Sequence, residues 1–362
     1  MEKREVVVIG AGPAGLSASI QAAKRGCKVT LVDENQKPGG QLFKQIHRFF
    51  GSKEHHAGVR GFVIGRRLLE EVKRLGIEVW LNSLVYGLFP SRRIGIVRDG
   101  KVYEVEAKAI IVATGAQEKA ISFPGWTLPG VMGAGACQTM INIHRVLPGK
   151  KVLMIGGGNV GLIVSYQLLQ AGAEVKGVIE ILPRIGGYLV HASKIARCGV
   201  PILTSHTIVE AKGEEEVERA VIAPVDEKMQ PVMNKAKEIE VDLITLAVGL
   251  TPMVELLHPL GCRFTYKPFL GGWVPSHNED MMSTVEGVFV AGDLAGVEEA
   301  STAIEEGKIA GIAVAEYLGY GKWEEGKEEA RERLKAFRIG PFGEERGKSK
   351  EEIVREYYER KV

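Results

Sequence analysis

Two stretches of the chain repeat the same order of apolar and polar positions. The first, residues 5–34, runs from the apolar EVVVI through GAGPAG into a segment of helical length, then into the apolar KVTLV before two acids. The second, residues 150–180, begins KKVLMI, passes through GGGNVG and ends in VKGVIE. Short apolar runs on either side of a longer segment are typical of a strand–helix–strand unit. We therefore predict strands at 5–9 and 28–32, joined by a helix that ends near Gly26, and the same elements in the second stretch.

Each stretch places three glycines in the turn between its first strand and its helix: Gly10, Gly12 and Gly15 in the first, and Gly156, Gly158 and Gly161 in the second. In this spacing the first glycine permits a tight turn, the second lets the backbone approach a pyrophosphate, and the third lets helix and strand pack closely. The helix N-terminus adds free N–H groups and a partial positive charge. An acid at the end of the second strand can accept hydrogen bonds from ribose hydroxyls, a position held by Asp33, with Glu34 beside it, and by Glu180.

The complete order of strand, glycines, helix and acid is far more specific than an isolated glycine motif. Two such units predict two bound dinucleotides, or one dinucleotide and another adenine nucleotide. A duplicated fold whose second site holds no nucleotide is the alternative.

Composition narrows the class of protein further. The chain has 362 residues, 45% of them hydrophobic, which suits two packed domains, and no stretch approaches the roughly 20 apolar residues of a membrane span. A formal charge of +2 with mixed signs throughout argues against a nucleic-acid partner. The four cysteines form no CxxC pair, so we expect neither zinc nor disulfides, and a cytoplasmic location. His47, His55 and His56 lack carboxylates or cysteines at ligand spacing, and we predict no metal site.

Four further motifs resemble those of the flavoproteins with two dinucleotide-binding domains, of which thioredoxin reductase is the compact type. They are PGGQLF (38–43), AIIVATGA (109–116), LAVGLTP (246–252) and GVFVAGD (287–293), and they occur in the family's order. The resemblance implies an α/β fold of two Rossmann-like domains with mainly parallel sheets, in which an NAD-binding domain is inserted into an FAD-binding domain.

The resemblance also implies cofactor contacts at matching positions. For a non-covalently bound FAD they are Gly10, Gly12, Pro13, Ala14, Gly15, Asp33, Glu34, Gly40, Gln41, Val85, Ala113, Thr114, Gly115, Gly292, Asp293 and Ala300. For NAD(H) they are Gly156, Gly158, Asn159, Val160, Gly161, Glu180 and Gly249. In the family, the aspartate of the GVFVAGD motif binds the ribityl chain of the flavin, and Asp293 holds that position here.

The predicted domains are interleaved along the chain. The FAD-binding domain is predicted to comprise residues 1–122 and 256–320, the NAD-binding domain 123–255, and a charged helical tail 321–362. The proline-containing segments that begin at Phe123 and at Leu250 are expected to be the two crossover linkers. We interpret the tail as a solvated terminal helix, with a docking element as the alternative.

One segment of the NAD-binding domain departs from the parallel pattern. In residues 217–242 valine-rich and polar stretches alternate without helical period, which predicts a small antiparallel sheet. Residues 213–218, GEEEVE, are expected to be a hairpin loop within it.

The redox-active cysteine pair of thioredoxin reductases is absent. Aligning that pair with GVMGAGACQT (130–139) puts Ala134 at the first cysteine and Cys137 at the second, which excludes dithiol–disulfide chemistry in that mode. We interpret Cys137 as a small buried residue. A reactive thiol beside the flavin, which would need a lowered pKa, is the alternative, and no other catalytic side chain is predicted. Lys44 and His47 could tune the flavin charge or simply be exposed polar residues.

A closer resemblance is to the α-type nucleotide-binding subunits of heteromeric amine dehydrogenases: sarcosine oxidase, opine oxidase, hydrogen cyanide synthase and dye-linked L-proline dehydrogenase. It rests on GGQLFKQIHRFFGS, ATGAQEKAISFPGWTLPGVMGAGACQT and GDLAGVEEASTAIEEGKIAG. Many such subunits continue into a cysteine-rich iron–sulfur module, whereas residues 321–362 contain no cysteine. A cluster, if the complex has one, is therefore expected on another polypeptide. HRFFGS (47–52) is a candidate partner contact, unless Phe49 and Phe50 pack under the flavin loop.

These resemblances imply a function. We expect an FAD-dependent oxidoreductase subunit that exchanges hydride with NAD(H) and relays electrons within an amine or amino-acid dehydrogenase complex, where its partner is an FAD-dependent dehydrogenase. One alternative is a stand-alone NAD(P)H reductase of ferredoxin, quinone, oxygen or peroxide, and the other is a relay subunit whose second site binds an adenine nucleotide structurally. Glu180 favours NADH over NADPH, although Arg184 could approach a 2′-phosphate.

Overall fold

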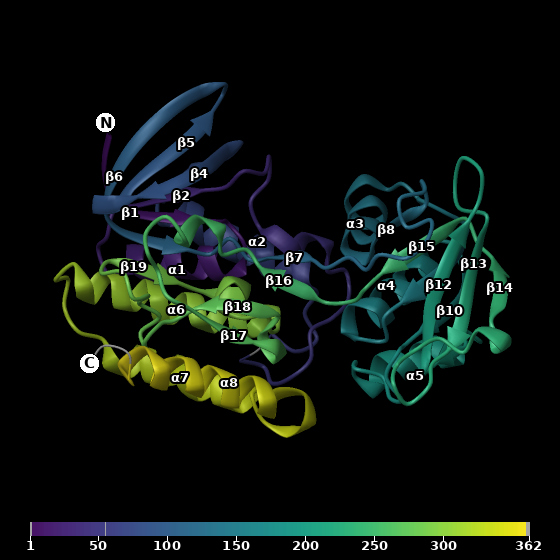
Figure 1. The fold of residues 1–362 in the computed structure, drawn as a ribbon. Helices are drawn as coiled ribbons and strands as arrows, with labels where there is room; N and C mark the ends of the chain where they lie inside the picture. The colour runs from purple at the N-terminus through teal and green to yellow at the C-terminus, as the bar shows by residue number, and fades with distance from the viewer. Residues whose placement is uncertain (1, 55, 360–362) are drawn as a thin grey trace. The chain divides into compact units, whose positions relative to one another are not determined.

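The computed structural model describes residues 2–54 and 56–359 and divides the chain into two compact units. The first unit contains the residues up to Gln117 and those from Thr251 onward, and the second unit is Glu118–Leu250 (Figure 1). Strands β7 (Ala116–Glu118) and β16 (Leu250–Pro252) pair with each other where the chain passes between the units. The chain changes units five residues before each boundary that the sequence suggested, and Phe123 already packs in the core of the second unit.

The first unit is built on a seven-stranded sheet in the order β3-β2-β1-β6-β5-β4, with β19 also paired to β6. Strands β3, β2, β1, β6 and β19 run parallel, and the first half of β6 turns the sheet antiparallel through β5 and β4. Its elements are β1 (Glu2–Ile9), α1 (Pro13–Lys24), β2 (Val29–Val32), the short 3-10 helix η1 (Gly40–Lys44), α2 (Gly61–Arg74), β3 (Glu78–Trp80), β4 (Ser83–Phe89), β5 (Arg93–Arg98), β6 (Lys101–Val112), β17 (Phe264–Lys267), β18 (Gly272–Pro275), β19 (Val288–Val290), η7 (Gly292–Ala295), α6 (Ala300–Tyr317), α7 (Glu324–Phe337) and α8 (Gly340–Glu359).

The second unit has a five-stranded parallel sheet in the order β11-β10-β9-β15-β8, and a three-stranded antiparallel sheet β12-β13-β14. Its elements are β8 (Val131–Gly133), α3 (Ala134–Thr139), β9 (Lys151–Ile155), α4 (Asn159–Gln170), β10 (Glu174–Ile179), α5 (Leu189–Arg197), β11 (Ile202–Leu203), β12 (His206–Lys212), β13 (Arg219–Pro224), β14 (Lys237–Glu240) and β15 (Leu243–Leu246). The antiparallel sheet and the hairpin loop at 213–218 that the sequence suggested are therefore confirmed.

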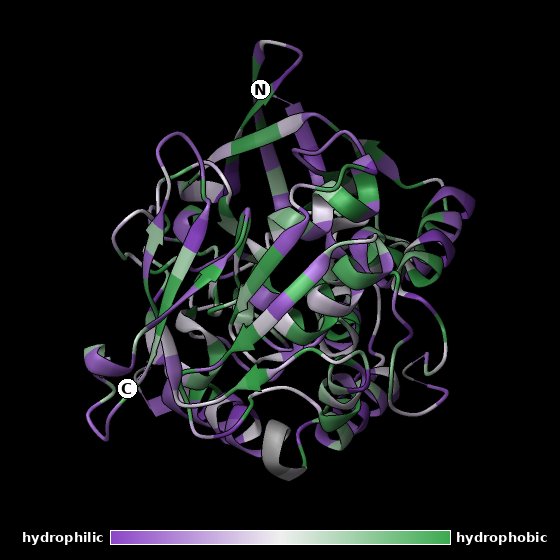
Figure 2. Ribbon diagram, turned by 90° about the vertical axis from the view of Figure 1, so that its right-hand side faces the viewer, coloured by the Kyte–Doolittle hydropathy of each residue, from purple (hydrophilic) through white to green (hydrophobic). Residues whose placement is uncertain are grey.

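Both sheets follow from the pattern of apolar positions. Strands β2 and β15 are buried along their whole length, as parallel strands covered on both faces must be. The strands drawn in Figure 2 accordingly carry long apolar stretches, while many of the loops are polar. An α/β fold of two Rossmann-like units, with mainly parallel sheets, is confirmed.

Helices α1 and α6 of the first unit pack at a glycine contact. A Cβ atom on Gly307 would lie 2.2 Å from the carbonyl oxygen of Ala14, and one on Gly311 would lie 2.3 Å from that of Ala18. The two glycines are one helical turn apart on α6, so they form a groove that admits the backbone of α1. This contact holds the N-terminal half of α1 in place over the sheet.

The C-terminal tail differs from the sequence interpretation. It forms two helices, α7 and α8, drawn in yellow in Figure 1, rather than a single solvated one. Leu334, Ile353 and Tyr357 are buried, and so are the aliphatic stems and ammonium groups of Lys327 and Lys350. The tail is therefore part of the first unit. Its high charge suggested solvent, but many of those charges are paired within the fold.

None of the helices in residues 2–54 and 56–359 combines the length and apolar character that crossing a lipid bilayer requires.

The glycine contact gives a stability prediction. We expect Gly311→Ala to lower the free energy of unfolding by about 1–3 kcal/mol, because the new methyl group meets a backbone carbonyl that cannot move alone. Gly326→Ala in α7 is the matched control, since its Cβ would meet only side-chain ends of Arg25 and Ile312 at 3.3 Å and gains up to about 1 kcal/mol of helix propensity. Urea unfolding followed by circular dichroism measures both. Equal midpoints for the two variants would contradict the packing argument.

Candidate functional site

The turn between β1 and α1 forms a cradle of backbone N–H groups. Gly10 has φ +100°, and a Cβ there would lie 2.3 Å from the carbonyl oxygen of Ala113 at the end of β6. A Cβ on Gly15 would lie 1.8 Å from the carbonyl oxygen of Gly10, so the helix cannot approach the strand this closely with any other residue. A Cβ on Gly12 would meet nothing within 4 Å. The space beside Gly12, in front of the helix N-terminus, fits a pyrophosphate group.

Asp33 completes this cradle at the end of β2. Its carboxylate is 7% exposed and accepts hydrogen bonds from the backbone N–H of Ala11 at 2.6 Å and of Asn35 at 2.8 Å. Two backbone donors fix the carboxylate beside the glycine turn while leaving lone pairs for ribose hydroxyls. Glu34 is exposed on the following turn. Of the two adjacent acids, Asp33 is the one that the fold orients.

Several other predicted flavin contacts gather at the same edge of the sheet. A Cβ on Gly40 would lie 2.9 Å from Cα of Gly12, and one on Gly292 would lie 2.8 Å from Cβ of Ala14. The carboxyl ends of β1, β6 and β19 meet there because the three strands are parallel. Glycines at these positions leave the backbones of four separate segments in close approach.

The remaining predicted flavin contacts are placed less closely by the structure. The Thr114 hydroxyl donates to the carbonyl oxygen of Met253, which anchors the loop after β6. Val85 is buried in β4, and Gln41 is exposed on η1. Ala300 is the first residue of α6. Their contact with a flavin stays a prediction.

The second unit repeats the cradle. Gly156 has φ +112° and a Cβ there would lie 2.2 Å from the carbonyl oxygen of Ala247, while one on Gly161 would lie 2.0 Å from that of Gly156. A Cβ on Gly158 would meet nothing within 4 Å. The Glu180 carboxylate, 8% exposed, accepts from the N–H of Gly157 at 2.8 Å and of Leu182 at 3.0 Å. This arrangement has the same plan as the cradle in the first unit.

The first turn of α4 carries two further predicted contacts. The side-chain oxygen of Asn159 accepts from the backbone N–H of Tyr188 at 2.8 Å, which ties the segment before α5 to the cradle. Val160 is exposed beside it. Gly249 has φ +119° and its carbonyl accepts from the N–H of Lys119. Arg184 is exposed in the turn after Glu180.

Cys137 lies in α3 and is fully buried in the core of the second unit. Burial, together with the charge of Glu118, raises the pKa of its thiol to about 12. Glu118 itself caps α3, accepting from the N–H groups of Gly135 at 2.6 Å and Ala136 at 3.1 Å. A thiol in this environment stays protonated at neutral pH, which supports the interpretation of Cys137 as a packing residue.

A network of four charges behind the flavin motif was not foreseen from the sequence. This tail network consists of Glu298, Glu306, Arg338 and Lys350. Arg338 donates to both oxygens of Glu298, at 3.0 and 2.6 Å, and to Glu306 at 2.7 Å. Lys350 donates to Glu306 at 2.6 Å.

The tail network reaches the GVFVAGD motif directly. Oε2 of Glu306 accepts from the backbone N–H of Gly292 at 3.0 Å, and Lys350 donates to the carbonyl oxygen of Ala295 at 3.1 Å. Removal from water, together with the charges of Glu306 and Glu299, raises the pKa of Asp293 to about 7. The loop that carries Asp293 is therefore held from behind by α6 and by the C-terminal tail. The signal in the sequence was the pair of glutamates, 305 and 306, within an otherwise apolar helix.

The segment at 47–52 divides between the two interpretations. Phe49 is buried with Leu42, Ile64 and Ile304, beneath the η1 loop, whereas Phe50 is 44% exposed. Among the described residues no group of three or more His, Cys, Asp or Glu side chains forms a metal-binding cluster, and His55 lies outside the described residues.

Comparisons with known proteins agree with this geometry. A family model described as pyridine nucleotide-disulphide oxidoreductase matches residues 4–307. Hydrogen cyanide synthase subunit HcnB from Pseudomonas aeruginosa is 30% identical over 334 residues, covering 85% of this chain and 70% of HcnB. An opine oxidase subunit from Agrobacterium tumefaciens is 28% identical, covering 85% of this chain but only 65% of its own length. Among solved structures, thioredoxin reductase from T. acidophilum matches with TM-score 0.72 at 21% identity, covering 87% of this chain and 99% of that one, which shows a shared fold.

The burial of Cys137 predicts its reactivity. When the native protein is treated with iodoacetamide at pH 8, we expect alkylation of the exposed Cys198 and none of Cys137, whose raised pKa leaves almost no thiolate. Peptide mass spectrometry reads out each cysteine separately, and alkylation in guanidinium chloride, where all four should react, is the control. Modification of Cys137 in the native protein as fast as that of Cys198 would restore the reactive-thiol alternative.

Proposed function

Since the chain belongs to the pyridine nucleotide-disulphide oxidoreductase family, we propose that it is an FAD-dependent subunit that exchanges hydride with NAD(H) and relays electrons within a heteromeric amine or amino-acid dehydrogenase. The observation that carries the proposal is the pair of matching cradles, each with an open second glycine and a buried carboxylate held by two backbone donors. One cradle is proposed for FAD and the other for NAD(H).

The residues of the chain act as binding and orienting groups. Bound FAD would supply the hydride chemistry, which needs no side-chain base. The N-terminus of α1 would hold the pyrophosphate, and Asp33 the ribose of the adenosine half. Gly292 and Asp293 would contact the middle of the cofactor from the carboxyl end of β19. Because the pKa of Asp293 lies at about 7, its carboxyl group can donate or accept a hydrogen bond there near neutral pH.

Electrons are proposed to leave through a partner rather than through thiols. The sequence has no CxxC pair, and Cys137 is buried with a raised pKa. The two relatives compared above are named as subunits of larger enzymes, hydrogen cyanide synthase and opine oxidase. The chain covers 70% and 65% of those subunits, so its own amine substrate, its partners and its cytoplasmic location are proposals.

Glu180 gives a prediction on cofactor choice. We expect NADH to reduce the flavin at least about tenfold faster than NADPH at limiting nucleotide concentration, because a buried carboxylate at the ribose repels a 2′-phosphate. Glu180→Gln should narrow the ratio while keeping an oxygen acceptor for the backbone of the turn. Glu174→Gln, at the exposed start of β10, is the matched control and should leave the ratio unchanged. Stopped-flow absorbance measures all three proteins, and equal or faster reduction by NADPH in the unsubstituted protein would defeat the claim.

The partner proposal is tested in the source organism. The chain, isolated under native conditions, should elute with an FAD-dependent amine or amino-acid dehydrogenase, and native mass spectrometry should give a mass above that of its homo-oligomer. The co-eluting complex should reduce a dye with an amine substrate, which the chain alone should not. A homo-oligomer that turns over NADH with ferredoxin, quinone, oxygen or peroxide, without another subunit, would establish the stand-alone reductase instead.

A further inference from the structure

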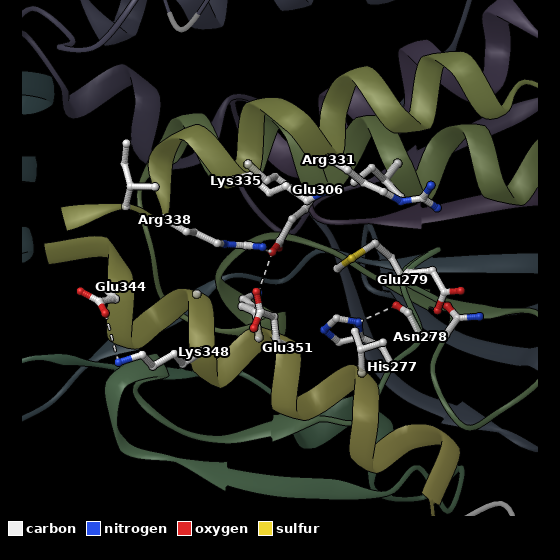
Figure 3. Close-up of a pocket in the computed structure, with 17 residues that line it drawn as sticks. His277, Asn278, Glu279, Glu306, Arg331, Lys335, Arg338, Glu344, Lys348 and Glu351 are labelled. Atoms are coloured by element: carbon white, nitrogen blue, oxygen red, sulfur yellow. Dashed lines mark hydrogen bonds and ion pairs between the residues drawn. The ribbon is translucent and has the colours of Figure 1, made fainter. Parts of the chain in front are cut away.

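A cavity of about 530 Å³ lies within the first unit, between α6, α7, α8 and the turn at 277–281 (Figure 3). Its volume is in the range of small-molecule pockets. None of the residues predicted to contact FAD lines it. The cavity is therefore a site separate from the glycine cradle, although Glu306 of the tail network forms part of its wall.

His277 lines this cavity with one nitrogen left over. Its side chain is 3% exposed, and Nδ1 lies 2.9 Å from the backbone carbonyl oxygen of Asn278. A carbonyl oxygen can only accept, so Nδ1 carries the hydrogen and donates. Nε2 is on the opposite edge of the ring and is buried without a hydrogen-bond partner among the residues that the structure describes. Figure 3 shows the ring turned so that Nδ1 faces Asn278 and the other edge faces away from it.

The ring of His277 is neutral, which fixes the chemistry of Nε2. Burial and the positive charges of Lys350 and Arg338 lower the pKa of His277 to about 3. At neutral pH Nε2 is therefore a bare lone pair, an acceptor. A buried acceptor without a donor is costly, and buried polar groups in proteins are nearly always paired. The missing partner is an N–H or O–H group.

The rest of the wall limits what can carry that donor. Met281, Ile309, Leu334 and Val354 provide apolar surface. The nearby cations of the tail network are already neutralised by its two glutamates, so the inner wall calls for no charged ligand. The same cations that lower the pKa of His277 disfavour an ammonium group beside it. An uncharged donor on an apolar body fits best.

We propose that this cavity binds a small, uncharged, mainly apolar molecule that donates one hydrogen bond, from a hydroxyl or N–H group, to Nε2 of His277. Such a molecule would also lie against Glu306, whose carboxylate accepts from Gly292 of the flavin motif. Binding itself does not depend on the proposed function, because the cavity lies in the first unit and uses neither cradle.

The experiment compares two probes that differ in the donor. Indole offers one ring N–H, whereas 1-methylindole has the same ring system without it. Isothermal titration of the flavin-containing chain should give one site for indole, with 1-methylindole binding at least about tenfold more weakly. His277→Phe should remove this preference, and His277→Gln, which keeps an acceptor, should retain part of it. His258→Phe, an exposed histidine outside the cavity, is the control and should bind like the unsubstituted chain.

A second measurement needs no substitution. In the ¹⁵N spectrum of histidine-labelled protein, the signal of an unprotonated, neutral ring nitrogen should shift when indole is added and stay in place with 1-methylindole. Equal binding of the two probes, no binding of indole, or indole binding that leaves every histidine signal unmoved would each overturn the proposal. All of these readouts are independent of NADH oxidation, so failure here is distinguishable from failure of the proposed function.

Discussion

The contact between a glycine and the carbonyl oxygen of the residue five positions before it sets the geometry of both units. In the first unit Gly15 packs on Gly10, and in the second Gly161 packs on Gly156, each at a separation that excludes any side chain. Only this contact lets the helix start directly behind the strand end. Its free N–H groups then face the edge where the neighbouring parallel strands also end. The buried acids and the space in front of each helix are consequences of that one close approach.

The features predicted from the sequence are those that depend on neighbours along the chain. The glycine turns, the acids Asp33 and Glu180 and the parallel order of strands are encoded within stretches of about 30 residues, as the nucleotide-binding fingerprint requires. The fold class is therefore readable from the sequence, and so is the division into two nucleotide-binding halves. The predicted points of changeover lie five residues late, because proline-containing segments resemble linkers although Phe123 belongs to a core.

The features missed depend on partners far apart in sequence. Arg338 and Lys350 are 32 and 44 residues from Glu306, and a run of lysines, arginines and glutamates reads as solvent-exposed when its partners are unknown. Burying four charges costs desolvation, and removing one member of such a group typically costs about 3–5 kcal/mol because another charge is left uncompensated. The network therefore specifies where the tail docks more than it adds to stability. His277 was invisible for the same reason, since its environment comes from three helices later in the chain.

The interleaving of the two units has a consequence for the order in which the protein can assemble during synthesis. Residues 118–250 are contiguous, so the second unit can fold as soon as it has left the ribosome. The first unit must wait: β6 gains β19, α1 gains α6, and the loop at Gly292 gains Lys350 only after the whole second unit has been translated. Until then β1, β2 and β6 expose apolar faces to the cell. A nascent chain stalled between the two halves would present these strands for aggregation, and the early folding of the second unit shortens the tether across which the ends of the first must find each other.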